Sequence, residues 1–403
     1  MITDKQPKAE VNIMEENKTR NYIKEVLENM PADWLNLTTH RLDIYDEGQA
    51  KTQFLDQFEE LYESNTSDTA AFAELPTAYD YIRLGHPLSS VLEWAMAKLN
   101  KVKPESVISF SSKTAPILAV LRKNLLAGKN TQILYTGELP DCFDADVIRK
   151  VYGYNFDIKK FEEGKSISAY SGTTILISQQ NEVGAIENTS SGIDFYINLY
   201  AELGSVLMVN GETNENYISE VQHVRRRETI AMTPANCLTA LKSLVGQTPF
   251  EAKKYDTAAN KASVLKSIRE ITGSQTKALV ASSGLSTQYA IMMGLVHDAV
   301  ENHPGKAIKF VVPPNCYGGT NDQARRVAAC LANVEVVDLP VDGGNDMVRS
   351  VDAVLDQIAA EGAIPYIIAE IPTNPRVEVP DLQKLKAALS KERKTPTGEV
   401  AID

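Results

Sequence analysis

The sequence predicts an α/β protein with mostly parallel sheets covered by helices, and three observations carry this prediction. Short apolar runs rich in β-branched residues alternate with helical segments from about residue 105 onward. The same alternation begins again near residue 276. The chain has 403 residues, which is the length of two or three ordinary domains. Because strands that alternate with helices form βαβ units, we expect parallel strands with helices on both faces of each sheet.

Composition and charge exclude several classes of protein. Hydrophobic residues make up 43% of the chain and charged residues 23%, which is the balance of an ordinary globular protein. The 53 acidic residues outnumber the 41 basic ones, so the formal net charge is −12. A chain without a basic excess has no broad surface for nucleic acid. No apolar run approaches the length of about 18 residues that spans a bilayer. We therefore expect neither nucleic acid nor a membrane as a partner.

The cysteines and the first residues bear on metal binding and localisation. The chain has four cysteines, none of them in a C-x-x-C spacing: Cys142, Cys237, Cys316 and Cys330. This scatter predicts neither a metal site nor a disulfide framework. Residues 1–17 are polar and lack the apolar core of a signal peptide. Free thiols without an export signal predict a cytoplasmic protein.

The first part of the chain is predicted to be helical. Apolar residues recur at helical spacing over residues 21–30 and 53–62. The pattern changes twice further along, so we predict three domains. They are a helical N-terminal arm over 1–75, an α/β domain over 76–240 and a second α/β domain over 241–403.

Individual elements follow from the same patterns. In the first α/β domain, the predicted strands are 106–112, 131–137, 173–179 and 205–210, and the predicted helices include 114–126 and 192–203. The second α/β domain shows strand patterns over 276–282, 307–312, 334–339, 366–371 and 399–403. Its predicted helices are 286–302, 320–333, 348–361 and 382–391. The segment 228–266 is predicted to be mostly helix or loop.

The two α/β domains resemble a diverged internal duplication. Asn181 and Asn374 each follow a predicted strand, and they are 193 residues apart. Asn210 and Asp403 also each end a strand, at the same separation. Equal separations at two landmarks favour a duplication.

Ligands in open α/β sheets bind beyond the carboxyl ends of the strands, and unusual residues stand at two such ends. Ser283, Gly284 and Leu285 follow one predicted strand and open a helix. Gly284 allows a ligand to approach the backbone closely, and the helix N–H groups attract an anion. Residues 317–320 (Tyr-Gly-Gly-Thr) follow the next strand, and their glycines allow a close turn that presents the Tyr317 ring. Each motif alone is also typical of a structural turn.

Two further features end later strands. Residues 370–375 read Glu-Ile-Pro-Thr-Asn-Pro, and the two prolines fix a turn that holds the Asn374 amide in one direction. Asp403 closes the last predicted strand. A carboxylate at the end of a buried strand is costly unless a cation or hydrogen-bond donors meet it. A positive partner is therefore implied beside Asp403.

In this order, the four features resemble the trans-sulfuration (Cys/Met metabolism) family of pyridoxal-phosphate (PLP) enzymes. The family pattern is a Ser-Gly-Met phosphate loop, a Tyr-Gly-Gly-Thr segment, a Glu-x-Pro-x-Asn-Pro turn and an Asp that ends the next strand. The phosphate loop corresponds to residues 283–285 here, with Leu in place of Met. The resemblance covers 277–403 well and 79–210 faintly. It implies an aspartate-aminotransferase-like (fold type I) large domain, with a diverged α/β copy N-terminal to it.

The resemblance also implies PLP as cofactor and a role for each residue. The backbone N–H groups of Gly284 and Leu285 would bind the cofactor phosphate. Tyr317 would stack on the pyridine ring and Asn374 would bond the ring hydroxyl. Asp403 would keep the pyridinium nitrogen protonated. Tyr317 and Asp403 are therefore the expected catalytic residues, and no metal is implied.

A fifth family element lies in the first half of the chain. Residues 81–87 (Tyr-Ile-Arg-Leu-Gly-His-Pro), with a Leu-Glu pair after them, match the family segment Tyr-Ser-Arg-x-Gly-Asn-Pro. In the family this Tyr and Arg reach across a subunit interface to the neighbour's cofactor phosphate. The resemblance implies the same role for Tyr81 and Arg83, since a guanidinium donates bidentate bonds to phosphate. The alternative for Arg83 is a surface ion pair, and Arg225 is expected at the surface.

The two halves depart from the family in complementary ways. The first half has Lys113, Asp141 and Asn210 at the positions of the loop glycine, the ring tyrosine and the strand-ending aspartate. A neutral amide cannot keep a pyridinium charged, so the first half should not bind a working cofactor. The second half has residues 255–257 (Tyr-Asp-Thr) where a Tyr-x-Arg is expected. We infer that the first half acts as the neighbouring subunit of a fused pseudo-dimer with one working site.

The family's Schiff-base lysine follows the strand-ending aspartate, and a smaller domain comes after it. This chain stops at Asp403, and the matching interval after Asn210 offers no lysine over residues 214–227. The expectation is that the chain is the N-terminal portion of a longer protein or a truncated product.

The leading hypothesis is a PLP-dependent enzyme that forms homo-oligomers and acts on a sulfur amino acid or an activated homoserine. The reaction would be an elimination or a γ-replacement, as in cystathionine γ-synthase or a C–S lyase, with the cofactor as electron sink. One alternative is a non-catalytic or truncated relative that serves as a structural or regulatory subunit. Another is a nucleotide-binding α/β protein, which is weakened because the chain contains neither G-x-G-x-x-G nor G-x-x-x-x-G-K-[ST].

Overall fold

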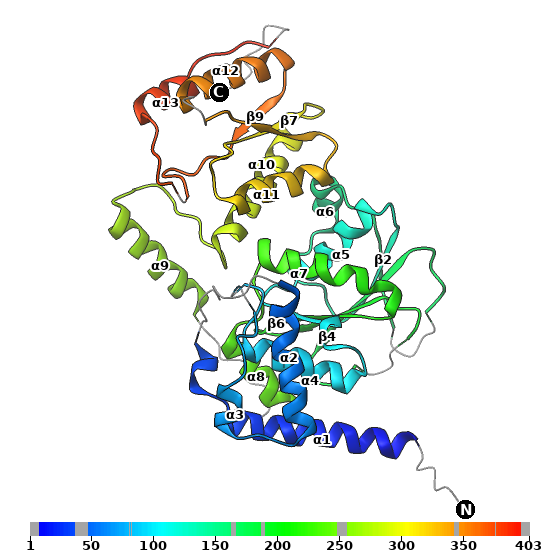
Figure 1. Cartoon of the computed structure of the whole chain (residues 1–403). Helices are drawn as coiled ribbons and strands as arrows, with labels where there is room; N and C mark the ends of the chain where they lie inside the picture. The colour runs from blue at the N-terminus through cyan, green and yellow to red at the C-terminus, as the bar shows by residue number, and fades with distance from the viewer. Residues whose placement is uncertain are drawn as a thin grey trace, which may run out of the picture. The chain divides into compact units, whose positions relative to one another are not determined.

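The computed structural model describes residues 8–36, 47–79, 81, 83–162, 167–186, 190–247, 256–341, 346–374 and 376–395. The chain divides into two compact units (Figure 1). Unit 1 comprises Met1–Phe143 and Asn155–Ala278, and unit 2 comprises Asp144–Tyr154 and Leu279–Asp403. No helix in these described ranges is both long enough and apolar enough to cross a membrane.

Unit 1 begins with helices and continues as an α/β sheet. Its helical elements are α1 (Lys8–Asn29), η1 (Ala32–Leu35), α2 (Glu47–Glu63), α3 (Thr69–Ala73), α4 (Pro87–Asn100), η2 (Pro104–Ser106), α5 (Ala115–Leu126), η3 (Glu212–Tyr217), α7 (Ile218–Arg227), α8 (Pro234–Leu244) and α9 (Thr257–Thr272). Its strands are β1 (Val107–Phe110), β2 (Thr131–Thr136), β3 (Asp157–Lys160), β4 (Thr173–Gln180), β5 (Phe195–Tyr200) and β6 (Gly204–Val209).

The six strands of unit 1 lie in the order β1-β6-β5-β4-β2-β3. Strands β3, β2, β4 and β5 run parallel to one another, and β6 runs antiparallel to both of its neighbours, β5 and β1. The expectation of a mostly parallel sheet with helices is confirmed. Every residue of β1, β5 and β6 is buried. Strands β5 and β6 have neighbouring strands on both sides, whereas β1 lies at the edge of the sheet and is contacted by α4 and α7.

The aromatic residues of the N-terminal helices belong to the main core of unit 1. Phe58 and Tyr62 of α2 pack edge-on against Trp94 of α4, with ring centroids 5.1 Å and 4.9 Å apart. The Trp94 indole N–H donates to the Glu59 carboxylate at 2.6 Å. Helix α4 is therefore enclosed, whereas α9 buries none of its residues.

Unit 2 has a smaller sheet. Its helices are α6 (Ala145–Tyr152), α10 (Gly284–Asn302), α11 (Gly318–Cys330), α12 (Met347–Glu361) and α13 (Leu382–Leu389), and its strands are β7 (Ile308–Val312), β8 (Val334–Asp338) and β9 (Ile364–Ile367). The strands lie in the order β8-β7-β9 and all are parallel. Helix α6 packs on α10, which explains why residues 144–154 group with unit 2.

The two sheets share an arrangement. In unit 1 strand β2 lies between β3 and β4, and in unit 2 strand β7 lies between β8 and β9. In each case the first strand of the three is central, the second and third flank it, and all are parallel. Helix α5 precedes β2 as α10 precedes β7. This shared order supports the proposal of an internal duplication.

Two element predictions are wrong. The predicted helix over 192–203 is instead strand β5, whose six residues are buried between β4 and β6. A short apolar run fits a buried strand or a buried helix equally well by periodicity, and here the neighbouring strands decide. The predicted strand over 276–282 does not form, because no strand among the described residues pairs with it. The predicted strand over 399–403 lies outside the described residues.

Candidate functional site

The N-terminus of α10 in unit 2 offers backbone donors. Ser283 caps this helix, and its hydroxyl oxygen accepts a hydrogen bond from the Ser286 N–H at 3.1 Å. The N–H groups of Gly284 and Leu285 have no carbonyl to pair with inside the helix. Gly284 is exposed, and a Cβ built on it would meet nothing within 4 Å, while the Leu285 side chain is buried. Leu285 is thus anchored in the core, with its backbone at the positive end of the helix.

The N-terminus of α11 meets a carboxylate from beyond β9. Tyr317 caps α11, and its N–H donates to Glu370 Oε2 at 3.2 Å. The Thr320 hydroxyl donates to Glu370 Oε1, and Gln288 Nε2 of α10 donates to the same oxygen at 3.2 Å. One carboxylate thus joins the beginning of α11, the first turns of α10 and the segment after β9. Three of the sequence motifs are brought together at the carboxyl edge of the sheet.

Cys316 precedes the Tyr317 motif and is buried. Burial raises the pKa of its thiol, and the negative charge of Glu370 raises it further. The group therefore stays protonated at neutral pH and is not a thiolate nucleophile.

The turn after Glu370 is held by the buried residue Thr373. Its hydroxyl oxygen accepts from the Glu378 N–H at 2.9 Å, and its own N–H donates to the Glu378 carbonyl at 3.0 Å. Asn374 lies in this turn and is exposed. Asp403 lies outside the described residues, so its role stays a prediction.

Tyr81 and Arg83 lie together in unit 1. The Arg83 guanidinium donates to the Tyr81 hydroxyl and lies 4.6 Å from the centre of the Tyr81 ring. A second guanidinium, that of Arg226, lies 4.8 Å from the same ring. Arg83 is only 8% exposed, and within the described ranges no carboxylate pairs with it. The alternative of a surface ion pair is therefore not found among the described residues.

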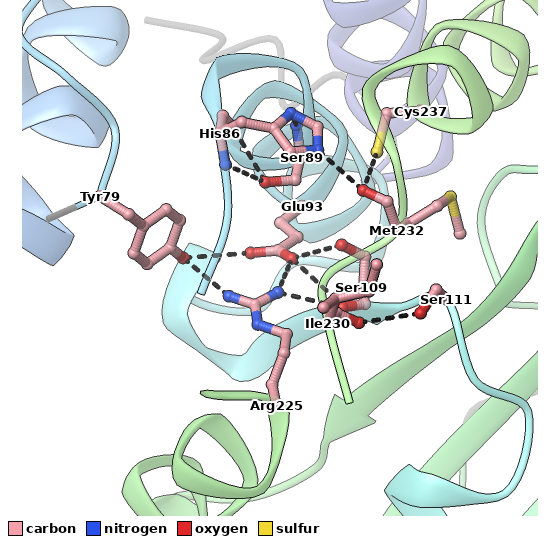
Figure 2. Close-up of polar contacts among 10 residues, drawn as sticks. All are labelled: Tyr79, His86, Ser89, Glu93, Ser109, Ser111, Arg225, Ile230, Met232 and Cys237. Carbon is pink, nitrogen blue, oxygen red and sulfur yellow. Dashed lines mark hydrogen bonds and ion pairs between the residues drawn. The ribbon is translucent and has the colours of Figure 1, made fainter. Parts of the chain in front are cut away.

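Arg225 is not a surface residue, which corrects the prediction. It is fully buried, and its Nη1 lies 2.5 Å from Glu93 Oε1 (Figure 2). The same carboxylate oxygen accepts from the Ser109 N–H at 2.8 Å and from its hydroxyl at 2.6 Å. Arg225 also donates to the Tyr79 hydroxyl at 3.2 Å. The carboxylate and three donor residues form one buried network, which sequence alone did not reveal because these residues lie on separate elements.

This network fixes the segment that carries Tyr81 and Arg83. Tyr79 precedes the segment, and its ring is so close to Gly85 that a Cβ there would lie 2.3 Å from a ring carbon. The Arg83 carbonyl accepts from the Ala231 N–H at 3.0 Å. Only glycine fits at position 85, which explains its place in the motif.

His86 caps α4 at the end of the same segment. Its Nδ1 accepts from the Ser89 N–H at 3.2 Å, so Nε2 carries the proton and donates to the Met232 carbonyl at 2.7 Å (Figure 2). Burial lowers the pKa of His86 to about 4, against the opposing effect of the Met232 hydrogen bond. The ring is therefore neutral at neutral pH. Burial also raises the pKa of the Cys237 thiol well above its usual value, so neither group titrates near pH 7.

Sequence reasoning missed Gln288 and Arg226. Gln288 stands four residues after Gly284, on the same face of α10, and this spacing is a signal that could have pointed to it. Nothing in the local sequence relates Arg226 to Tyr81. In the described part of the chain, no group of three or more His, Cys, Asp or Glu side chains could hold a metal ion.

No protein-family model matches the chain, and no curated protein sequence matches it. Similar solved structures include cystathionine gamma-lyase from yeast, with 12% identity, coverage of 68% of this chain and 70% of that one, and a TM-score of 0.35. A protein from Campylobacter jejuni described as an O-acetylhomoserine (thiol)-lyase, with N'-pyridoxyl-lysine-5'-monophosphate, has 11% identity, coverage of 56% and 70%, and a TM-score of 0.31.

The O-acetylhomoserine sulfhydrylase of Wolinella succinogenes is also similar, with 10% identity and a TM-score of 0.27. The match covers 40% of this chain and 62% of that one. At these TM-scores the similarity does not by itself establish a common fold, and it places the chain in no family. The case for a function therefore rests on the chain's own residues.

Proposed function

We propose that this protein binds pyridoxal 5'-phosphate and acts on a sulfur amino acid or an activated homoserine. The observation that carries the proposal is the Glu370 network, which joins the Tyr-Gly-Gly-Thr and Glu-Ile-Pro-Thr-Asn-Pro motifs at one edge of a parallel sheet and reaches α10 at Gln288, one turn after the Ser-Gly-Leu motif. Ligands of open α/β sheets bind at this edge. The reaction class is elimination or γ-replacement, by the family resemblance of these motifs.

The residues fit the cofactor in charge and in shape. The N-terminus of α10 supplies backbone donors to a phosphate, and the space beyond Gly284 is open. Gln323 lies one turn beyond Thr320 on α11 and is fully buried, and neither of its amide atoms has a hydrogen-bond partner in the described residues. A buried amide without partners is costly. The buried Gln323 amide therefore lacks a hydrogen-bonding partner among the described residues.

Each residue has a proposed task. Gly284 and Leu285 bind the phosphate through their N–H groups, and Ser283 holds the helix end that presents them. Tyr317 covers the pyridine ring, and Asn374 donates to the ring hydroxyl. Asp403 holds a proton on the ring nitrogen. When bound, the cofactor withdraws electrons from the amino acid attached to it.

Arg83 and Tyr81 are also proposed to bind a cofactor phosphate, in line with the hypothesis that the chain is a fused pseudo-dimer. The buried Arg83 cation without a carboxylate partner in the described residues supports this, and so does the strand order that the two sheets share. Asn210, the proposed counterpart of Asp403, donates to the carbonyls of Ser190 and Ile193 at 3.1 Å and 2.6 Å. It therefore has a structural task, in keeping with a first half that binds no cofactor of its own. We further propose a cytoplasmic protein that forms homo-oligomers.

Titration of pyridoxal 5'-phosphate into the full chain, followed by absorbance, tests the proposal. We expect saturable binding that inorganic phosphate weakens by competition. Tyr317→Ala and Asn374→Ala should each bind more weakly, whereas Asn302→Ala, an exposed amide at the other end of α10, should bind as the unchanged chain does. An unchanged chain that binds no cofactor would refute the proposal. Binding without turnover of any sulfur amino acid would favour the non-catalytic alternative.

A further inference from the structure

Glu370 is held more firmly than an ordinary carboxylate at a strand end. Both of its oxygens accept hydrogen bonds, one from the Tyr317 N–H and the other from Thr320 and Gln288. The donors come from the backbone and side chains of two helices, α10 and α11, which pack on each other. Such a carboxylate keeps one position, because each donor would lose its partner if it moved.

The groups around the carboxylate hold one another as well. The Thr320 hydroxyl is completely buried and lies 2.9 Å from Gln288 Oε1. The single proton of the Thr320 hydroxyl goes to one oxygen at a time, Glu370 Oε1 or Gln288 Oε1, while Gln288 Nε2 donates to Glu370. Thr320, Gln288 and Glu370 thus form one cluster of polar contacts between the beginning of α11, the first turns of α10 and the segment after β9.

The N-termini of α10 and α11 differ in the group that accepts hydrogen bonds from their backbone N–H donors. Helix α10 is capped by the neutral hydroxyl of Ser283. Helix α11 has no side-chain cap from Tyr317, and the Glu370 carboxylate takes the N–H there instead. A helix N-terminus carries partial positive charge and attracts anions. At α11 that charge is already met by the protein's own anion, so an incoming phosphate is left with α10.

We propose that Glu370 is a positioning residue with two tasks: it holds Tyr317 and the first turn of α11 in place, and it reserves the α10 N-terminus for the phosphate. The second task rests on the proposed function. The first is a property of the chain without any ligand, so the two can be tested apart.

Hydrogen exchange of the ligand-free chain tests the first task. In Glu370→Ala the Tyr317 N–H loses a charged acceptor, whose contribution of about 1.5–3 kcal/mol corresponds to about ten- to a hundredfold faster exchange. Asp338→Ala is the matched control, because Asp338 also ends a strand of this sheet but contacts the exposed Arg325 at 2.6 Å. Equal exchange at Tyr317 in the unchanged chain and in Glu370→Ala would overturn the proposal.

Binding tests the second task. Glu370→Ala should bind pyridoxal 5'-phosphate about tenfold more weakly, because Tyr317 is no longer held. It should bind inorganic phosphate at least as well as the unchanged chain, since a second helix N-terminus is now open. Weaker binding of both ligands to the same extent would contradict the positioning role. Thr320→Val replaces the hydroxyl by a methyl group and should show the same pattern more weakly, which keeps the test valid if Glu370→Ala folds poorly. An unchanged chain that binds no pyridoxal 5'-phosphate would refute the proposed function, while the exchange result would still decide whether Glu370 holds Tyr317.

Discussion

At the scale of single residues, the buried ion pair of Arg225 and Glu93 is expected to contribute strongly to the stability of unit 1. Both are nearly inaccessible, and each would be an uncompensated charge without the other. Replacing Arg225 by Ala should lower the free energy of unfolding by about 3–5 kcal/mol, as for other broken buried pairs. Chemical denaturation with a probe in unit 1 measures this.

The control is Lys103→Ala, which breaks the exposed pair with Glu215 in the same unit. Exposed pairs contribute little to stability, so this variant should unfold nearly as the unchanged chain does. Similar losses of unfolding free energy in the two variants would mean that the buried Glu93 network stabilises unit 1 no more than an exposed ion pair does.

His86 makes the stability of unit 1 depend on pH. Its pKa is about 4 in the folded chain and near 6.5 in the unfolded chain, because burial penalises the charged ring. The stability it contributes is fully present above pH 6.5 and is lost as the pH falls toward 4, where the unfolded state alone takes up the proton. The loss should reach about 3 kcal/mol. The measured free energy of unfolding should decrease as the pH is lowered from 6.5 to 4. The decrease should be less steep in His86→Asn, because Asn keeps an N-cap but does not titrate. Identical pH dependence in the two proteins would exclude His86 as the source.

At the scale of elements, one substitution at the N-terminus of α10 can test anion binding without disturbing the helix cap. Ser283→Asp keeps a good N-cap, so the unfolding free energy should change by less than about 0.5 kcal/mol. The added negative charge stands where the phosphate should bind, and binding of pyridoxal 5'-phosphate should weaken about tenfold or more. Asp346→Ser makes the reverse exchange at the cap of α12 and should leave binding unchanged. Unimpaired binding by Ser283→Asp would show that the phosphate binds elsewhere.

Elements also show where sequence patterns stop being informative. Helices α10 and α12 were predictable because a capping residue and helical spacing mark them locally, at Ser283 and over 348–361. Strand β5 was predicted as a helix, because a short apolar run carries no period that separates the two. Its place between β4 and β6 makes it a strand.

At the scale of the whole molecule, Arg83 tests whether the first half serves the second. It belongs to unit 1, whereas the α10 and α11 motifs belong to unit 2. If the pseudo-dimer proposal holds, Arg83→Ala should weaken binding of pyridoxal 5'-phosphate about ten- to a hundredfold. Arg83→Lys should recover only part of the affinity, since an ammonium lacks the planar fork. Arg269→Ala, an exposed arginine of α9, is the control. Equal affinity of Arg83→Ala and the unchanged chain would make unit 1 an ordinary packing domain with respect to this ligand.

The sequence by itself determined the α/β class, most helices and strands, and the motifs around Gly284, Tyr317 and Glu370. These depend on local propensity, capping and turn chemistry, which act between residues close in the chain. Only the tertiary structure decided that Glu370 meets Tyr317 across 53 residues and that Arg225 meets Glu93 across 132. It also decided that Arg225 is buried and that 195–200 is a strand. Such outcomes depend on which surfaces pack together, and a buried charge or an apolar run acquires its role only from the partners that packing brings to it.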